Sequence, residues 1–137
     1  MADCLFCNIR DGKIPSVTVY EDAYVFAFLD SNPVNPGHTL VAPKIHCRRM
    51  SETDNAMLAQ LVAAAKKLGD AVCAAMGASA YNFMTNNGAD AGQVVMHLHF
   101  HLIPRFSGDG HRMWKGTPYA EGEMEKIGKM IKKTVGV

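Results

Sequence analysis

The distribution of hydrophobic and polar residues along the chain predicts five strands. Runs rich in β-branched and aromatic residues lie at residues 17–20, 23–29, 38–42, 81–85 and 93–103. The first two runs are joined across Glu21-Asp22 as a hairpin, and a polar, proline-rich loop at 30–37 follows them. Pro43 and Pro104 are expected to end the third and fifth runs, because proline offers no N–H to a sheet.

Apolar positions spaced three or four residues apart predict a long helix in the middle of the chain. This stripe comprises Leu58, Leu61, Ala65, Leu68, Val72 and Met76. In front of it, Ser51 and Asp54 resemble a capping box, and Gly77 supplies a stop at the other end. A helical turn is expected at residues 4–10. A second amphipathic helix is marked by Met124, Ile127, Ile131 and Val135. The order of strands, helix, strands and helix is typical of an α+β fold with a mostly antiparallel sheet.

Length and charge limit the possible classes of function. A chain of 137 residues fits one domain, so residues 1–137 are expected to form a single domain. The formal net charge of +1 disfavours a surface for a nucleic acid polymer, but it leaves room for a local phosphate pocket. The absence of a long apolar run and of a secretory signal pattern favours a cytoplasmic protein without a membrane span. The four cysteines then fit reduced thiols or metal ligands better than a disulfide framework.

Three alternating histidines, His97, His99 and His101, are the chemical centre of the sequence. Alternation along a strand places them on one face, about 6–7 Å apart at each step. The residues alone leave two functional interpretations open: a three-histidine metal site, or phosphoryl chemistry with one imidazole as covalent nucleophile. The alternative without a function is an exposed polar face of the strand that contains histidines by chance. The small residues of the loop 88–93 favour phosphoryl chemistry, because their backbone N–H groups could approach an anion.

This region resembles the histidine-triad (HIT) family of nucleotide-binding proteins, and the likeness is closest to the Hint-like branch and its bacterial-type relatives. The motif is His97-x-His99-x-His101 followed by two apolar residues. Further matches, in the family's order, are Phe6, Ile14-Pro15, Tyr20-Glu21-Asp22, Ala27-Phe28-Leu29-Asp30, Asn32-Pro33, Pro36-Gly37-His38, Pro43-Lys44-Ile45-His46, Asn86 and Gly92-Gln93. The resemblance implies an α+β HIT fold with an antiparallel sheet of about five strands, one long helix and a C-terminal helix. The triad core would span about 4–105 and an extension 106–137, with sheets joined edge to edge across a homodimer.

The resemblance also assigns roles to residues of this chain. It makes His99 the nucleophile that attacks the α-phosphorus of a nucleotide, with His101 on the phosphate oxygens or the leaving group. His38 and Gln93 would complete the catalytic set. The expected nucleotide-binding residues are Phe6, Ile14, Phe28, Leu29, Asp30, Asn86, Gly92, Gln93, Val94, His99 and His101. Among these, Asp30 would bind the ribose hydroxyls, with turn formation as its alternative role. Val94 stands where the Hint branch often has a serine, a departure that weakens the expectation of efficient amine release.

Cys4-x-x-Cys7 has the spacing of two thiolates on one zinc ion, but a single pair of this kind is also compatible with a redox dithiol or two unrelated cysteines. Family members with this pair add two histidines. The implied ligands of a structural Zn²⁺ are Cys4, Cys7, His46 and His97, and no catalytic metal is expected. Cys47 is a rival ligand, and Cys73 is expected to pack on the long helix.

The function that follows from the resemblance is a purine nucleotide-binding hydrolase or transferase. Its substrates would be small nucleoside phosphoramidates or related nucleotidyl bonds, cleaved through a nucleotidyl-histidine intermediate with release of the mononucleotide. The alternatives are a dinucleoside polyphosphate hydrolase of the Ap3A or Ap4A type and a nucleotide-binding scaffold with weak turnover. Trp114 in the extension is a candidate contact with the pocket of the dimer partner.

Overall fold

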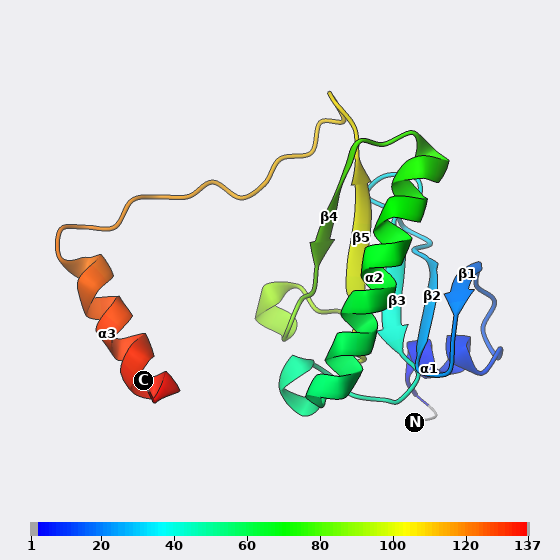
Figure 1. Cartoon of the computed structure of the whole chain (residues 1–137), viewed down its shortest axis with the longest axis horizontal. Coiled ribbons are helices and arrows are strands. Elements are labelled where there is room, and N and C mark those ends of the chain that lie inside the picture. Colours follow the sequence, from blue (N-terminus) through cyan, green and yellow to red (C-terminus); the bar gives the residue numbers. More distant parts are fainter. Residues whose placement is uncertain (1–2, 137) are drawn as a thin grey trace.

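A five-stranded antiparallel sheet forms the centre of the computed structural model, which describes residues 3–136. The strands are β1 (Thr18–Glu21), β2 (Val25–Leu29), β3 (Thr39–Pro43), β4 (Ala80–Met84) and β5 (Phe100–Arg105). They are arranged in the order β1-β2-β3-β5-β4, so β1 and β4 are the two edges (Figure 1). All five predicted strands are present, although the fifth begins later than predicted, and the predicted α+β class is confirmed.

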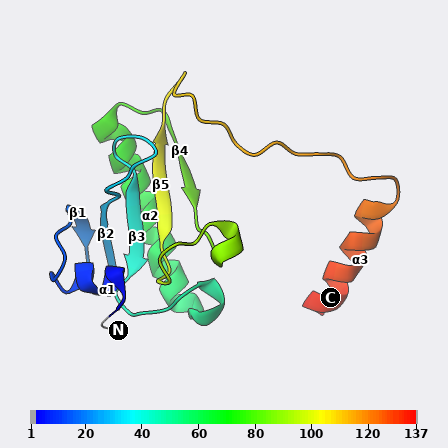
Figure 2. The ribbon, with the colours of Figure 1, turned by 180° about the vertical axis from the view of Figure 1, so that it is seen from behind.

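Helices cover the two faces of the sheet unequally. The long helix α2 (Asn55–Met76) lies across one face, and the short helix α1 (Leu5–Arg10) lies at one end of the other (Figures 1 and 2). On the α2 side, the period-two alternation of the strands places Val41 and Leu102 in the main core with Leu61 and Leu68 of the helix. Leu98, which precedes β5, belongs to the same core. On the α1 side, Phe6 joins a smaller cluster with the alternate strand residues Phe26, Phe28, Leu40 and Ala42.

The ends of α2 confirm one predicted signal and correct the other. Gly77 ends the helix with φ = +70°, the left-handed conformation that glycine adopts without steric cost. The N-cap, however, is Asp54 and not Ser51: the Asp54 carboxylate accepts a hydrogen bond from the Met57 N–H at 2.8 Å. Ser51 lies in a separate 3-10 turn (Met50–Glu52). The capping box was therefore wrong because an acidic side chain nearer the first helical turn takes the capping role.

The fifth strand is shorter than predicted and begins later. The expected run 93–103 enters the sheet only at Phe100 and continues through Pro104 to Arg105. Pro104 is tolerated inside β5 because the pairing of β3 with β5 extends only to Leu102, so no N–H is missed on that side. On the other side Pro104 pairs with Tyr81 of β4. His97 and His99 consequently precede the strand, where their backbone is free of the ladder.

The C-terminal extension leaves the sheet at Asp109. The Asp109 carboxylate accepts hydrogen bonds from the side chains of Arg105 and Asn35 and from the N–H groups of Phe106 and His111. These contacts hold the pKa of Asp109 well below its usual range, with the Arg105 guanidinium as the main cause. They also set the direction in which the chain departs.

Beyond this point the chain runs to α3 (Glu123–Val135), which stands apart from the sheet and from α2 (Figures 1 and 2). The predicted amphipathic helix is confirmed. Most of its apolar stripe is exposed, including Met124, Ile131 and Val135. Within residues 3–136, no helix has both the length and the apolarity that a membrane crossing requires.

Candidate active site and candidate metal centre

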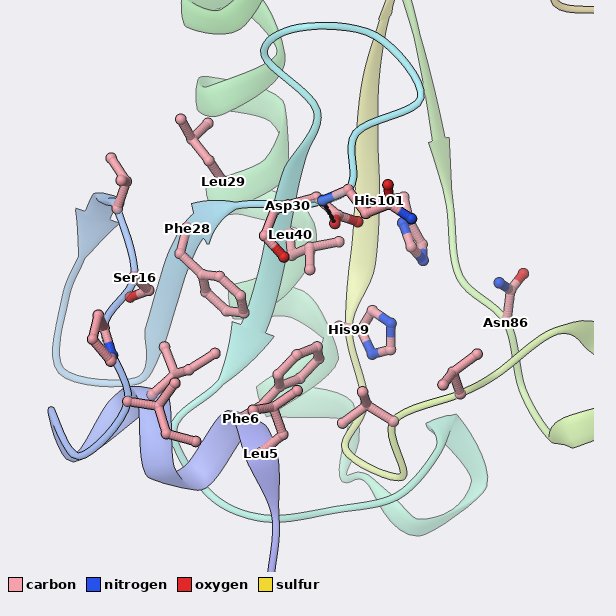
Figure 3. A pocket seen from close by; sticks show the side chains of 18 of the residues that line it. Leu5, Phe6, Ser16, Phe28, Leu29, Asp30, Leu40, Asn86, His99 and His101 are labelled. Atoms are coloured by element: carbon pink, nitrogen blue, oxygen red, sulfur yellow. Dashed lines mark hydrogen bonds between the residues drawn. The ribbon is translucent and has the colours of Figure 1, made fainter.

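A cavity of about 850 Å³ opens on the α1 side of the sheet (Figure 3). Its floor is apolar, and its other side presents imidazole, carboxylate and amide groups. All the predicted nucleotide-binding residues line it except Gln93. The floor includes Phe6, Ile14, Phe28, Leu29 and Leu40, and the polar side includes Asp30, Asn86, His99 and His101. A cavity with an apolar floor and a polar side suits a base joined to a ribose phosphate.

His99 is held in a single tautomer by its own backbone neighbourhood. Its Nδ1 lies 2.7 Å from the carbonyl oxygen of His97, so Nδ1 carries the proton and donates it there. The Nε2 lone pair is therefore left free. Burial lowers the pKa of His99, because the charged imidazolium is less well solvated there. His99 is thus a neutral imidazole at pH 7 with one available lone pair, which is the state of a nitrogen nucleophile.

His38 and His101 form a hydrogen-bonded pair whose tautomers are also determined. The Val34 N–H donates to His38 Nδ1 at 3.1 Å, so the proton of neutral His38 is on Nε2. This Nε2–H donates to His101 Nδ1 at 2.8 Å, which leaves the proton of neutral His101 on its own Nε2. Burial lowers the pKa of His38 and lowers that of His101 to about 4. His101 therefore offers a neutral N–H donor on the wall of the cavity.

Asp30 follows β2 and provides the carboxylate of the cavity. One of its oxygens accepts the Asn32 N–H at 2.8 Å, which is the turn role considered for this residue. The other oxygen lies 3.6 Å from His38 Nε2. With His101, these groups make a set of three donors that could hold a metal ion. The two imidazole nitrogens, however, are already satisfied by each other at hydrogen-bond distance.

Gln93 is buried, but its amide serves the loop 88–93 rather than the cavity. Its Oε1 accepts the Gly88 N–H, and its Nε2 donates to the carbonyl oxygens of Arg48 and Val95. The loop forms a 3-10 turn (Ala89–Ala91), and its N–H groups at residues 88, 91, 92 and 93 all have partners within the loop. The predicted approach of these backbone groups to an anion is therefore not favoured. Val94, next along, is 88% exposed at the mouth of the cavity.

Several residues of the cavity were not predicted, among them Leu5, Ile9 and Leu40. Leu5 and Ile9 flank Phe6 on α1, and their spacing of four residues is the signal of a shared helix face. Leu40 lies two residues after His38 and pairs with both Phe28 and His101. Alternation along β3 therefore places Leu40 on the same face as the functional residues, and this signal was available in the sequence.

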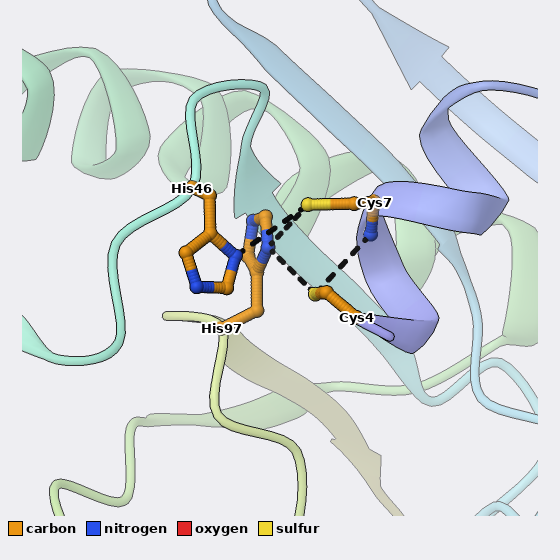
Figure 4. A group of neighbouring side chains, drawn as sticks. All are labelled: Cys4, Cys7, His46 and His97. Carbon is orange, nitrogen blue, oxygen red and sulfur yellow. Dashed lines mark hydrogen bonds between the residues drawn. The ribbon is translucent and has the colours of Figure 1, made fainter. Parts of the chain in front are cut away.

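A second cluster, of two cysteines and two histidines, lies where the start of α1 meets the segments that carry His46 and His97 (Figure 4). His97 Nδ1 is 3.4 Å from Cys4 Sγ and 3.6 Å from Cys7 Sγ, and His46 Nδ1 is 3.5 Å from Cys7 Sγ. The four candidate ligand atoms lie within 4.8 Å of one another. Residues far apart in the chain thus converge as the resemblance implied.

The donors of this cluster fit a zinc ion. The Nε2–H of His97 donates to the Pro43 carbonyl oxygen at 2.8 Å, which directs the lone pair of Nδ1 at the two thiols. Burial lowers the pKa of His97 to about 4, so the imidazole is neutral, as a ligand must be. Burial also raises the pKa of the Cys7 thiol, and a divalent cation would reverse this by stabilising the thiolate. Two soft thiolates with two imidazoles in a closed set of four are typical of structural zinc.

The remaining cysteines do not join the cluster. Cys47 is buried in the core on the α2 side, against Leu98 and Leu61, and Cys73 lies half-buried on α2. The rival assignment of Cys47 as a ligand is therefore not supported. The three-histidine metal site is also wrong, because His97 turns to the cysteines while His99 and His101 face the cavity. All three nevertheless lie on the α1 side of the sheet, as alternation predicted.

The fold and these two sites together define an α+β protein with a histidine-lined cavity beside a Cys₂His₂ cluster. A family model described as the HIT domain matches residues 11–108, and the chain belongs to this family.

Known proteins agree with this membership. The chain is 37% identical over 131 residues to adenosine 5'-monophosphoramidase HNT1 of Saccharomyces cerevisiae, covering 96% of this chain and 80% of that protein. The crystal structure of SMU.412c from Streptococcus mutans UA159 superposes with a TM-score of 0.92 at 40% identity, over 98% of this chain and 87% of that one. A Zn-bound histidine triad family protein from Mycobacterium smegmatis has a TM-score of 0.78 at 29% identity, over 98% and 94% of the two chains.

Proposed function

We propose that this protein is a hydrolase of nucleoside phosphoramidates, which cleaves the bond between phosphorus and the amine through a nucleotidyl group on His99. The observation that carries the proposal is the single tautomer of His99. Its Nδ1–H donates to the His97 carbonyl at 2.7 Å, while its free Nε2 belongs to a cavity of nucleotide size. The phosphoramidase activity in the name of the yeast relative supports this substrate class.

The cavity accommodates the nucleotide in one orientation. The base lies on the apolar floor, where Phe6 and Phe28 meet edge to face with ring centres 5.2 Å apart. Asp30 accepts hydrogen bonds from the ribose hydroxyls, since its carboxylate offers acceptor positions at the rim. The α-phosphate then lies between His99 and His101. We propose a purine, because a two-ring base covers more of the floor.

The reaction proceeds in two displacements. The Nε2 of His99 attacks the α-phosphorus, the bond between phosphorus and the leaving amine breaks, and that bond's electron pair goes to the amine nitrogen, which takes a proton. The Nε2–H of His101 donates a hydrogen bond to a phosphate oxygen and stabilises the charge that develops there. Water then attacks the same phosphorus and loses a proton to solvent, the electron pair of the bond between phosphorus and Nε2 returns to His99, and the mononucleotide is released with the neutral imidazole restored.

The chain offers no side chain at position 94 to protonate the leaving amine, since Val94 occupies it. We propose that the amine takes its proton from water at the open mouth of the cavity, where Val94 is 88% exposed. Substrates with a strongly basic leaving amine, such as AMP-lysine, are then turned over faster than those with a weakly basic one, because a more basic nitrogen takes a proton from water more readily.

Replacement of His99 tests the proposal. The variant His99→Ala should lose turnover of an AMP phosphoramidate by at least about a thousandfold, because the nucleophile is absent, while AMP still binds. The matched control is His111→Ala, a histidine of the C-terminal extension outside the cavity. Mass spectrometry of the acid-quenched parent protein should show one nucleotidyl adduct that the His99→Ala variant lacks. Turnover of His99→Ala near the parent rate would refute the nucleophile.

Two other functions are compatible with the same cavity. A dinucleoside polyphosphate hydrolase of the Ap3A or Ap4A type would use the same nucleophile with a nucleotide leaving group. A scaffold would bind AMP with little turnover. Parallel kcat/KM measurements on AMP phosphoramidate and Ap4A distinguish the two enzymes, and absence of any adduct on His99 identifies the scaffold.

We propose in addition that Zn²⁺ occupies the cluster of Cys4, Cys7, His46 and His97 in a structural role. The neutral, buried imidazole of His97 and its second hydrogen bond to Pro43 support this ligand set. A bound zinc ion would brace the N-terminal segment against the sheet, and the two displacements at phosphorus need no metal. One zinc per chain in the purified protein, lost in Cys4→Ser, is the expected result of metal analysis.

The active form is proposed to be a homodimer joined through β4. Both edge strands offer unpaired backbone groups, but β1 has an irregular register between Thr18 and Tyr20, which discourages further pairing. β4 has a regular register and presents Phe83, which is 39% exposed. The unpartnered apolar stripe of α3 gives a second surface for the other copy. Light scattering after size-exclusion chromatography should give twice the mass of the chain, and truncation before residue 106 should weaken the dimer.

A further inference from the structure

The metal-binding cluster and the proposed nucleophile share one residue. The side chain of His97 lies in the cluster, with Nδ1 facing the thiols and Nε2 bound to the Pro43 carbonyl. The backbone carbonyl of the same residue accepts the Nδ1–H of His99 at 2.7 Å. Any movement of His97 that follows a change in the cluster is therefore transmitted to the hydrogen bond that fixes the tautomer of His99.

A second contact path runs through α1. This helix is capped by Cys4, whose Sγ accepts the Cys7 N–H, so both thiols lie on the same turn. Between them in the sequence, Phe6 packs edge to face on the His99 ring, with ring centres 4.8 Å apart and planes at 86°. Phe6 also packs edge to face on the His97 ring, with ring centres 5.9 Å apart. The two thiols thus lie on the same helical turn as Phe6, the residue that packs against the His99 ring.

The helix α1 is also held to the body by side-chain packing, because Phe6 and Ile9 lie in the apolar cluster with Phe26, Phe28 and Leu40. Arg10 donates to the Lys44 carbonyl at the far end of the helix, and Leu5 is 42% exposed. The helix has six residues, too few to be stable without external contacts. The Cys/His cluster is therefore a second anchor of its first turn, and the position of Phe6 depends both on this anchor and on its apolar packing.

We infer that Cys4, Cys7, His46 and His97 are positioning residues for the reaction at His99, so that occupancy of their site by Zn²⁺ sets the turnover rate. The inference rests on the proposed function, since it needs His99 as the nucleophile. Loss of the ion loosens His97 and α1 together. The His99 ring then samples both tautomers and several orientations, and displacement of a reacting group by about 1 Å costs up to about a hundredfold in rate.

The spectroscopic test observes the His99 hydrogen bond itself. In protein labelled with ¹⁵N-histidine, the buried Nδ1–H of His99 should give a downfield proton signal in slow exchange, assigned by its loss in His99→Ala. Removal of zinc by a strong chelator, or by the substitution Cys7→Ser, should broaden or abolish this signal. The matched control is Cys73→Ser, a half-buried cysteine outside the cluster, which should keep the signal.

The kinetic test separates positioning from binding. In the same zinc-free samples, kcat for an AMP phosphoramidate should fall about tenfold to a hundredfold while KM stays within about threefold. Addition of Zn²⁺ to the chelated parent protein should restore both kcat and the His99 signal, and addition to Cys7→Ser should restore neither. Circular dichroism and a cooperative thermal transition establish that each zinc-free sample is folded.

Three results would overturn the inference. A folded, zinc-free protein that keeps the His99 signal and the parent kcat shows that the cluster acts independently of the nucleophile. Unfolding of both the chelated protein and Cys7→Ser shows a purely structural cluster. A parent protein that binds no Zn²⁺ shows that the turnover rate is not set by zinc at this cluster. The first two outcomes leave the proposed function intact, whereas an active His99→Ala variant refutes that function separately.

Discussion

Gly37, the residue before His38, is expected to be the most sensitive glycine of the site. Its φ of +93° lies in a region that side-chain-bearing residues rarely adopt, and a Cβ built there would lie 2.6 Å from Met76 Cγ. The substitution Gly37→Ala therefore combines two penalties. The left-handed backbone costs about 1–2 kcal/mol, and the forced rotation of Met76 costs about 1 kcal/mol more.

The chain provides a matched control in Gly12. Its φ is +72°, and a Cβ there would meet no atom within 4 Å, so Gly12→Ala carries only the backbone penalty. The reduced entropy of the unfolded chain affects both variants equally and cancels in the comparison. Urea unfolding should therefore show Gly37→Ala to be less stable than Gly12→Ala by about 1 kcal/mol. Gly37→Ala/Met76→Ala should recover part of this difference, since the clashing atoms are gone.

The same substitution should reduce activity without removing any group from the cavity. A shift of residue 37 moves His38, whose Nε2–H donates to His101 at 2.8 Å. We expect kcat/KM for the phosphoramidate to fall about tenfold in Gly37→Ala and to stay at the parent value in Gly12→Ala. Equal stabilities of the two variants, or no rescue by Met76→Ala, would refute the steric reasoning. An unchanged kcat/KM would refute the link to His38.

Three further predictions follow from buried polar groups and from the helix cap. Burial lowers the pKa of His101 to about 4, against 6.5 for an ordinary imidazole, so the unfolded chain takes up this proton first as the pH falls. The free energy of unfolding should therefore decrease between pH 6.5 and 4, by at most about 3 kcal/mol from this residue, and urea unfolding of His101→Asn should show a flatter dependence. Asp54→Ala should lower the free energy of unfolding by about 1 kcal/mol, because the hydrogen bond from the Met57 N–H is lost. Ser51→Ala, at the position of the expected capping box, should change the thermal stability little. Gln93→Leu should lower the free energy of unfolding by about 2–3 kcal/mol, because the Gly88 N–H and the Arg48 carbonyl lose their hydrogen-bond partners. Loss of activity with no loss of stability would instead favour a direct catalytic role for Gln93.

Local periodicity was sufficient to predict most of the framework. Alternation identified the strands, and the spacing of Leu61, Ala65 and Leu68 identified the buried face of α2. These features are predictable because each depends on residues within one or two turns of chain. Even the placement of the three histidines on the α1 side followed from a period of two.

What could not be predicted depends on contacts between distant segments. Nothing in the spacing of Cys4 and Cys7 reveals that His97 turns toward them, 90 residues along the chain. The amide of Gln93 was assigned to the cavity, but the Arg48 carbonyl, 45 residues away, takes it. The expected cap at Ser51 failed for a different reason, because Ser51 lies in the preceding 3-10 turn and Asp54, three residues further along, caps the helix instead.

The end of one strand ladder explains how two sites can occupy one short segment. Continuing the register of β3 and β5 would place Pro43 opposite Leu98, and proline has no N–H with which to continue the ladder. The Leu98 N–H bonds instead to the Cys47 carbonyl at 2.7 Å. Because pairing stops at Phe100, the His97 backbone is released from the sheet, and its carbonyl is available to His99. The Pro43 carbonyl then orients the His97 ring toward the thiols. A proline at the end of a strand therefore supports both the tautomer of His99 and the geometry of the Cys₂His₂ cluster.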